Sequence, residues 1–142
     1  MKYLFAALVA VLLSASSQSK APTAKTEEEI TRTVVDHHWK TFRDNDLEGT
    51  LVDYSEDSIL ITPNRTYKGM KEIRDNFVAA FAAFPKGGAT MQLNKTVVKR
   101  NVGYILWEAT GPKIRLSFGT DTFVIKDGKI ISQTYGGVAT AL

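Results

Sequence analysis

The chain has 142 residues, of which 44% are hydrophobic and 23% are charged. These proportions exclude an intrinsically disordered protein and fit one globular domain. The formal net charge is only +3, and the basic residues are scattered along the chain, so we expect no nucleic-acid partner. The absence of cysteine excludes disulfides, thiol chemistry and a lipid-anchoring motif, or lipobox.

The N-terminal residues have the pattern of an export signal. Lys2 supplies a positive charge, an unbroken apolar run covers residues 3–13, and small residues follow, as they do before a cleavage site. The apolar run is too short to span a membrane. We therefore expect a signal peptide at 1–17, a polar tether at 18–25 and a folded domain at 26–142. The mature protein would be periplasmic or secreted, without stable membrane anchoring after cleavage.

A helix is expected to begin after Thr26, because Thr26 and Glu29 have the spacing of a capping box. Apolar residues between Ile30 and Phe42 then fall on one side of the helix, and His38 lies in the middle of that side. His38 is either a core histidine with one satisfied nitrogen or a donor or base in the wall of a pocket. No other ligand lies at zinc spacing from it, so we expect no metal site.

The remaining elements follow in a simple order. A short helix is predicted after Asp46, then a strand over 58–62, a return over 66–68 and a helix from about 70 to 84. From residue 90 onward the sequence predicts strands over 91–99, 103–110, 114–125 and 129–135.

Two details of these strands guide the fold prediction. Asp127-Gly128 is typical of a two-residue hairpin turn, and alternation places Leu116 and Phe118 on the same dry face of their strand. The sequence therefore predicts an α+β fold, in which a curved antiparallel sheet wraps around N-terminal helices.

One carboxylate is unexpected in this pattern. Asp121, Phe123 and Ile125 share one face of a strand, because side chains alternate along it. A carboxylate among such residues is out of place in a plain core but suits the wall of a pocket. Desolvation there raises the pKa of a carboxyl group and makes it a candidate general acid or base. Candidate ligand-binding residues around it are Tyr54, Trp107, Phe123 and Tyr135.

The order and spacing of these motifs over residues 26–137 resemble the nuclear transport factor 2-like superfamily, in its SnoaL-like and ketosteroid-isomerase-like branch. The matching stretches are Asp44-Asn45-Asp46-Leu47-Glu48, Tyr54-Ser55-Glu56-Asp57-Ser58, Gly69-Met70-Lys71-Glu72-Ile73, Gly119-Thr120-Asp121-Thr122-Phe123 and Asp127-Gly128-Lys129-Ile130. The resemblance implies a cone-shaped domain with a deep apolar pocket between the concave face of the sheet and the helices. It also implies a homodimer formed through the sheet.

The resemblance implies roles for single residues. His38 falls where the isomerases place a tyrosine, Asp121 where they place a protonated aspartate, and Thr62 where they place the base carboxylate. Threonine cannot accept a proton from carbon, so true steroid isomerisation is disfavoured. In SnoaL-like cyclases an aspartate on the later strand is the acid/base, and Asp121 matches that position.

Three functions are compatible with this sequence, because the fold alone decides none of them. The first is a cofactor-free cyclase, isomerase or lyase that acts on a small apolar carbonyl compound, with Asp121 and His38 as catalytic residues and Thr62 among the binding residues. The second is an exported domain that binds a small molecule in the same pocket without catalysis. The third is a dimeric structural module in which Asp121 is merely hydrogen-bonded.

Overall fold

The computed structural model describes residues 24–142. The expected signal peptide and most of the expected tether lie outside the described residues. The helices are α1 (Glu27–Arg43), α2 (Leu47–Leu51) and α3 (Gly69–Ala83). The strands are β1 (Ile59–Ile61), β2 (Thr66–Lys68), β3 (Thr90–Lys99), β4 (Val102–Thr110), β5 (Ile114–Lys126) and β6 (Lys129–Ala141). Among residues 24–142, no helix has the length and apolar character that crossing a membrane requires.

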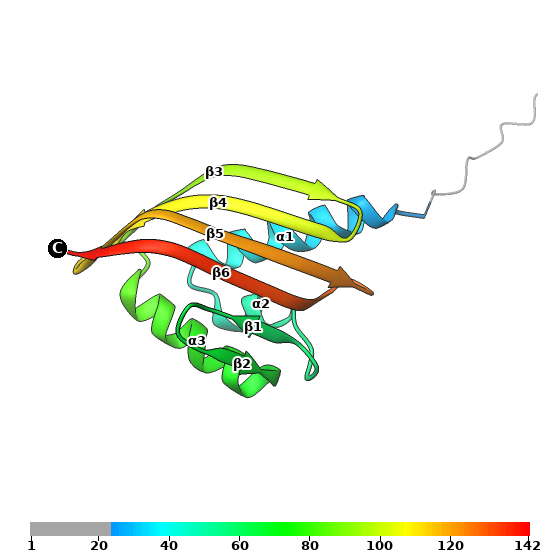
Figure 1. Ribbon diagram of the computed structural model, residues 1–142, viewed down its shortest axis with the longest axis horizontal. Helices are drawn as coiled ribbons and strands as arrows, with labels where there is room; N and C mark the ends of the chain where they lie inside the picture. Colours follow the sequence, from blue (N-terminus) through cyan, green and yellow to red (C-terminus); the bar gives the residue numbers. More distant parts are fainter. Residues whose placement is uncertain (1–23) are drawn as a thin grey trace, which may run out of the picture.

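The six strands form one open, curved sheet in the order β2-β1-β6-β5-β4-β3 (Figure 1). All neighbouring strands are antiparallel except β1 and β6, which run parallel. The predicted α+β fold with a curved, mainly antiparallel sheet is confirmed, and the parallel pair makes the sheet mixed. No hairpin joins β1 to β6, since the rest of the sheet lies between them in the sequence, and such a long connection permits parallel pairing.

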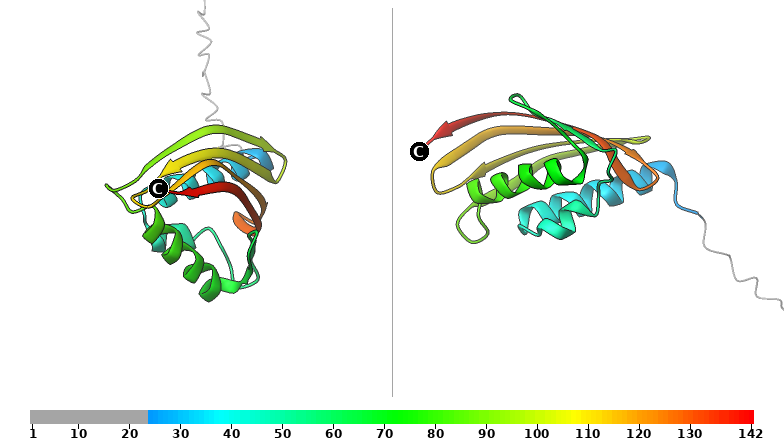
Figure 2. Two further views of the ribbon diagram at one scale, coloured as in Figure 1. Left: turned by 60° about the vertical axis from the view of Figure 1, so that its left-hand side comes forward. Right: turned by 90° about the horizontal axis from the view of Figure 1, so that it is seen from below.

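The long strands bend over α1 and α3, which both lie on the concave side of the sheet (Figure 2). The predicted capping box at the start of α1 is confirmed, because Thr26 and Glu29 each bond the other's backbone N–H. His38 is buried in the middle of the helix, while Ile30 at its beginning is 37% exposed and lies at the margin of the core. The main apolar core fills the space between these helices and the sheet.

The bend of the sheet coincides with irregular strand pairing. A β-bulge places an extra residue in one strand and increases the local twist and bend. Register shifts interrupt the pairing of β3 with β4 between Leu93 and Lys95, and the pairing of β5 with both of its neighbours between Leu116 and Gly119. The shift on β5 turns Phe118 outward, where it is 48% exposed. The prediction that Phe118 shares a dry face with Leu116 is therefore wrong.

The last strand is longer than the sequence predicts. β6 continues past Tyr135 to Ala141, although Gly136-Gly137 has the pattern of a strand break. Gly137 is needed at this position, because a Cβ atom there would lie 2.7 Å from the Tyr135 hydroxyl oxygen and 2.9 Å from the Phe118 carbonyl oxygen. The two glycines thus allow β6 to pair with the whole length of β5.

The β5–β6 turn is the predicted two-residue reversal, and both of its residues have positive φ, 51° at Asp127 and 73° at Gly128. The register on either side of Ile131 shows that this residue is an extra, unpaired residue of β6. Regular pairing from the turn would direct Gln133 and Tyr135 to the outer face. Because of the bulge, both side chains instead face the helices.

Candidate functional site

A cavity lies between the concave face of the sheet and helices α1 and α3. It contains about 660 Å³ of empty space, part of which is open to solvent. Most of its wall is apolar, and much of that apolar wall is aromatic. The polar side chains in the wall are His38, Thr62, Asn76, Asp121, Gln133 and Tyr135.

Asp121 occupies the centre of the concave face and is 6% exposed. It pairs in register with Ile105 on β4 and with Tyr135 on β6. Two donors from diagonal positions reach its carboxyl group. The Trp107 Nε1–H donates to Oδ2 over 2.8 Å, and the Gln133 Nε2–H donates to Oδ1 over 2.7 Å. Long side chains make such diagonal contacts between neighbouring strands.

The environment of Asp121 acts on its proton affinity in two directions. Burial raises the pKa of this carboxyl above its ordinary value of 3.8, and this is the largest effect. The hydrogen bonds from Gln133 and Trp107 and the charge of His38 oppose the rise without cancelling it. A carboxyl whose pKa is raised toward neutral pH is better suited to both accept and return a proton.

His38 is 3% exposed, and its ring packs edge-on against Phe77 and Phe123 at centroid distances of 5.6 and 5.2 Å. Its Nε2 lies 3.5 Å from the Tyr54 hydroxyl oxygen, and its Nδ1 lies 3.4 Å from Asp53 Oδ2. Neither of these partners lines the cavity. The ring nitrogens of His38 therefore face the polar groups behind the cavity wall.

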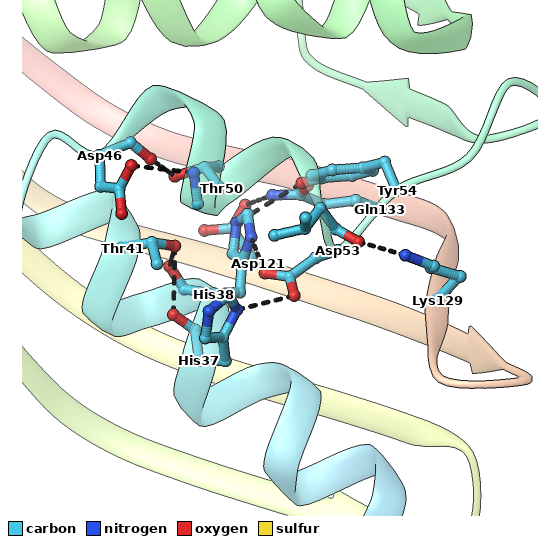
Figure 3. Close-up of polar contacts among 12 residues, drawn as sticks. His37, His38, Thr41, Asp46, Thr50, Asp53, Tyr54, Asp121, Lys129 and Gln133 are labelled. Atoms are coloured by element: carbon cyan, nitrogen blue, oxygen red, sulfur yellow. Dashed lines mark hydrogen bonds and ion pairs between the residues drawn. The ribbon is translucent and has the colours of Figure 1, made fainter.

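Tyr54 connects His38 to Asp121. Its ring is 3% exposed and lies behind the cavity wall, where its hydroxyl donates a short hydrogen bond to Gln133 Oε1. Burial, followed by the negative charges of Asp121 and Asp53, raises the pKa of this phenol, so that the hydroxyl remains a donor. Figure 3 shows the resulting sequence of contacts from His38 through Tyr54 and Gln133 to Asp121.

Asp53 extends the network toward the surface. This residue is 6% exposed, and its Oδ1 lies 2.8 Å from Nδ1 of His37, whose side chain is 44% exposed. His38 Nδ1 and Asp53 Oδ2 face each other within ion-pair distance, but they are not aligned as a hydrogen bond. Neither atom has a hydrogen-bond partner within residues 24–142. Asp53 thus faces two adjacent histidines of α1 at once.

Asp53 and Gln133 were not among the site residues predicted from the sequence. Gln133 is directed inward only by the bulge at Ile131, which no sequence pattern marks. Asp53 follows the short helix α2 among residues that show no periodic pattern. The other candidates from the sequence are brought close together, with Trp107, Phe123, Tyr135 and Thr62 in the cavity wall and Tyr54 behind it.

The mouth of the cavity is formed by its partly exposed residues, among them Thr62, Asn76 and Tyr135. The Thr62 hydroxyl donates to the Arg65 carbonyl oxygen over 2.9 Å and accepts from the Arg65 N–H over 3.1 Å. This side chain therefore closes the β1–β2 turn. In the described part of the chain, no three His, Asp or Glu side chains gather as ligands for a metal ion.

This chain is similar to a known protein family and to several solved structures. The family model described as a SnoaL-like domain matches residues 28–133. A Kribbella flavida structure provisionally named a ketosteroid isomerase has a TM-score of 0.68 and 17% identity, covering 81% of this chain and 82% of that one. A Sinorhizobium meliloti structure provisionally named a polyketide cyclase has a TM-score of 0.63 and 19% identity, with coverages of 73% and 94%.

A third structure, TerC co-crystallised with polyporic acid, has a TM-score of 0.64 and 16% identity, and covers 77% of this chain and 92% of that one. None of the curated proteins is significantly similar in sequence to this chain. At these identities the solved structures show a common nuclear transport factor 2-like fold, and they assign no reaction.

Proposed function

Because this chain belongs to the SnoaL-like domain family, a fold group related to ketosteroid isomerases and polyketide cyclases, we propose that it is a cofactor-free enzyme of carbonyl chemistry. Its reaction would be an isomerisation, cyclisation or elimination on a small apolar carbonyl compound. The observation that carries the proposal is the Asp121 carboxyl, which is buried in an apolar cavity and held by two N–H donors.

Asp121 would act as the acid/base. Its carboxylate removes a proton from a carbon next to the substrate carbonyl, which leaves an enolate. The same carboxyl then returns that proton to another atom of the substrate, so the enzyme ends each cycle unchanged. Trp107 and Gln133 keep both carboxyl oxygens in fixed positions, which removes the need to reorient the base during the reaction.

The shape of the cavity supports a small, largely apolar ligand. Aromatic side chains form much of its wall, and polar groups are confined to the Asp121 region and the mouth. Apolar walls with a few fixed polar groups are typical of small-molecule sites. The TerC neighbour, which was solved with polyporic acid, supports an organic ligand of this kind in the same fold.

A screen of small cyclic ketones and related carbonyl compounds tests the proposal. We expect the wild-type protein to convert at least one compound that also binds in the cavity. The matched control is Ala80→Trp, which fills the cavity from α3 and is expected to remove both binding and conversion. Conversion that survives Ala80→Trp would show that the chemistry occurs elsewhere.

A non-catalytic binding domain is the second candidate, and one observation favours it. At the position where the isomerase resemblance places a base, the Thr62 hydroxyl is engaged with the Arg65 backbone. A pocket of this kind can hold a ligand by shape and by the Asp121 carboxyl alone. This function predicts that Asp121→Asn weakens binding and that no compound is converted at any pH.

We also propose that two copies associate through the outer face of the sheet. Phe118 on β5 and Val138 on β6 are direct partners, and they are 48% and 57% exposed. Val97 on β3 and Val102 on β4 are also exposed, at 43% and 39%, farther along the sheet. Exposed apolar side chains on four strands support a protein partner, and a second copy would meet them with an identical surface.

Val138→Glu tests the association. It would place like charges on both sides of the contact, so we expect the protein to change from a dimer to a monomer in light scattering coupled to size-exclusion chromatography. The fold should persist, because this side chain is exposed. Thr140→Glu, farther along the same strand, is the matched control and should remain dimeric. A wild-type monomer across the micromolar range would contradict the proposal.

Export remains a proposal based on the N-terminal sequence, with cleavage near Ser17. If the native protein is exported, intact-mass measurement should give a mature chain that begins near Gln18. Recovery of the full-length chain from the cytoplasm alone would contradict export.

A further inference from the structure

We propose that Gln133 is a positioning residue that couples the protonation of Asp121 to that of His38. In this coupling, a proton on the Asp121 carboxyl and a proton on His38 Nε2 disfavour each other. The inference deepens the proposed function, because it concerns the same acid/base residue. It is argued from the direction of hydrogen bonds in the free protein and needs no substrate.

The four residues form one continuous chain of polar contacts, and we call it the polar chain. It runs from His38 Nε2 to the Tyr54 hydroxyl, from that hydroxyl to Gln133 Oε1, and from Gln133 Nε2 to Asp121 Oδ1 (Figure 3). All four side chains are at most 6% exposed. Buried polar groups require partners of the opposite kind, so each bond restricts the next one.

Trp107 fixes one end of the polar chain. An indole nitrogen can only donate, so Asp121 Oδ2 must accept from it in every protonation state. Because a carbonyl oxygen accepts more strongly than a hydroxyl oxygen, this bond favours Oδ1 as the site of a proton on the Asp121 carboxyl, and Oδ1 is the oxygen that Gln133 contacts. With the present amide orientation, a proton on Oδ1 that points along this contact would meet the Gln133 N–H, and two donors would face each other.

Reversal of the Gln133 amide removes this conflict. Its oxygen then accepts the Asp121 proton, and its NH₂ group faces the Tyr54 oxygen. Tyr54 now accepts from Gln133 and must donate its own proton onward to His38 Nε2. That nitrogen must therefore carry a lone pair, and His38 is neutral with its remaining proton on Nδ1, toward Asp53.

The orientation of the Gln133 amide in the structure suits the opposite protonation states of Asp121 and His38. Asp121 accepts two N–H donors as a carboxylate, and Tyr54 donates to Gln133. The Tyr54 oxygen is then available to accept from a proton on His38 Nε2. The glutamine amide thus has two orientations, one that matches an ionised Asp121 and one that matches a protonated Asp121.

Other ionisable groups near the polar chain do not change between these two orientations. Asp53 faces His38 Nδ1 at 3.4 Å and is itself paired with the half-exposed His37. Tyr135 adjoins Asp121, and burial followed by the Asp121 charge raises the pKa of its phenol. Lys129 donates to the Val52 carbonyl oxygen, one residue before Asp53. The two orientations therefore differ in the protons on Asp121 and His38.

The test is an NMR titration of His38 in which the ring nitrogen shifts report both charge and tautomer. The chain contains two histidines, so a His37→Gln variant assigns the signals. Asparagine at position 121 mimics a protonated aspartate, because it accepts from Trp107 and donates toward Gln133. We expect Asp121→Asn to lower the His38 titration midpoint by roughly one pH unit or more and to place the neutral proton on Nδ1.

The same substitution in a Gln133→Leu background separates coupling through the amide from simple charge attraction. Leucine interrupts the polar chain but leaves the Asp121 charge at the same distance. We expect Asp121→Asn to shift the His38 midpoint less than half as far in this background. Equal shifts in both backgrounds would overturn the proposal, as would no shift in either.

Two further variants serve as controls for the titration. Gln133→Met replaces Gln133→Leu if the latter does not fold, because methionine is flexible and lacks the amide donor. Thr134→Val, at the exposed neighbouring position, should leave the His38 titration unchanged. Because the titration is made on the free protein, its failure is distinguishable from a failure to find a substrate.

Discussion

Asp121→Asn is expected to lower turnover about 100- to 10,000-fold while ligand affinity changes little, because a positioned general acid/base contributes a factor of this size. Asparagine keeps the shape of the side chain and can still accept from Trp107. It cannot take a proton from carbon at any accessible pH. The measurement is kcat and Kd for a compound found by the carbonyl screen, determined for both proteins.

The matched control for this substitution is Asn76→Asp at the cavity mouth. It introduces a carboxyl near the same ligand but does not supply the two N–H donors that hold Asp121. We expect that it does not restore turnover when combined with Asp121→Asn. Turnover by the Asp121→Asn protein within about threefold of the wild type would contradict an acid/base role, since the factor expected is far larger.

Phe123→Ala is expected to destabilise the domain by about 3–5 kcal/mol, the usual cost of truncating a buried phenylalanine. Phe123 is fully buried at the centre of the concave face, and its ring lies 5.2 Å from the His38 ring. It supports His38 and also forms part of the cavity wall. The variant should therefore lose both stability and the defined position of His38, which chemical denaturation and the His38 NMR signals would report.

Two control substitutions separate the effect of losing a buried ring from the effect of losing any apolar side chain. Phe123→Leu keeps most of the apolar volume and should be destabilised by no more than about 1.5 kcal/mol. Val78→Ala removes an apolar side chain that is 52% exposed on α3, and its effect should stay within about 0.5 kcal/mol. If Phe123→Ala were as mild as Val78→Ala, the Phe123 ring would not contribute to the core as its burial indicates.

Local chemistry explains which parts of the fold the sequence could predict. The capping box of Thr26 and Glu29 and the Asp127-Gly128 turn involve neighbouring residues only, so their patterns are sufficient. The burial of His38 follows from helical periodicity, and the inward position of Asp121 follows from alternation with Phe123. All of these features are present in the structure.

The features that the sequence did not predict depend on contacts between distant residues. The bulges at the bend and at Ile131 form where the sheet must curve over α1 and α3, and each one reverses the faces of the residues that follow it. The outward turn of Phe118 and the inward turn of Gln133 both arise in this way. Likewise, Asp53 becomes part of the site only because α2 places it beside α1.

The stability of wild type and Asp121→Asn between pH 4 and pH 8 tests the central claim most directly, because it requires no substrate. The pKa of Asp121 is raised by burial in the folded state, so the folded protein binds this proton more tightly than the unfolded chain. The contribution of Asp121 to stability is therefore fully present below 3.8, the ordinary pKa, and declines as the pH rises through the folded-state pKa. The asparagine side chain of the variant does not titrate, so the difference between the two proteins isolates this effect.

We predict that the asparagine protein is the more stable one at neutral pH, by about 0.5–2 kcal/mol, as expected where a functional group is maintained at the expense of stability. Its advantage should shrink as the pH falls toward 3.8, the ordinary pKa of the carboxyl. If Asp121→Asn instead loses about 2 kcal/mol or more at neutral pH, the carboxylate stabilises a buried network. Asp121 would then be a structural anchor, and the acid/base account of the cavity would be wrong.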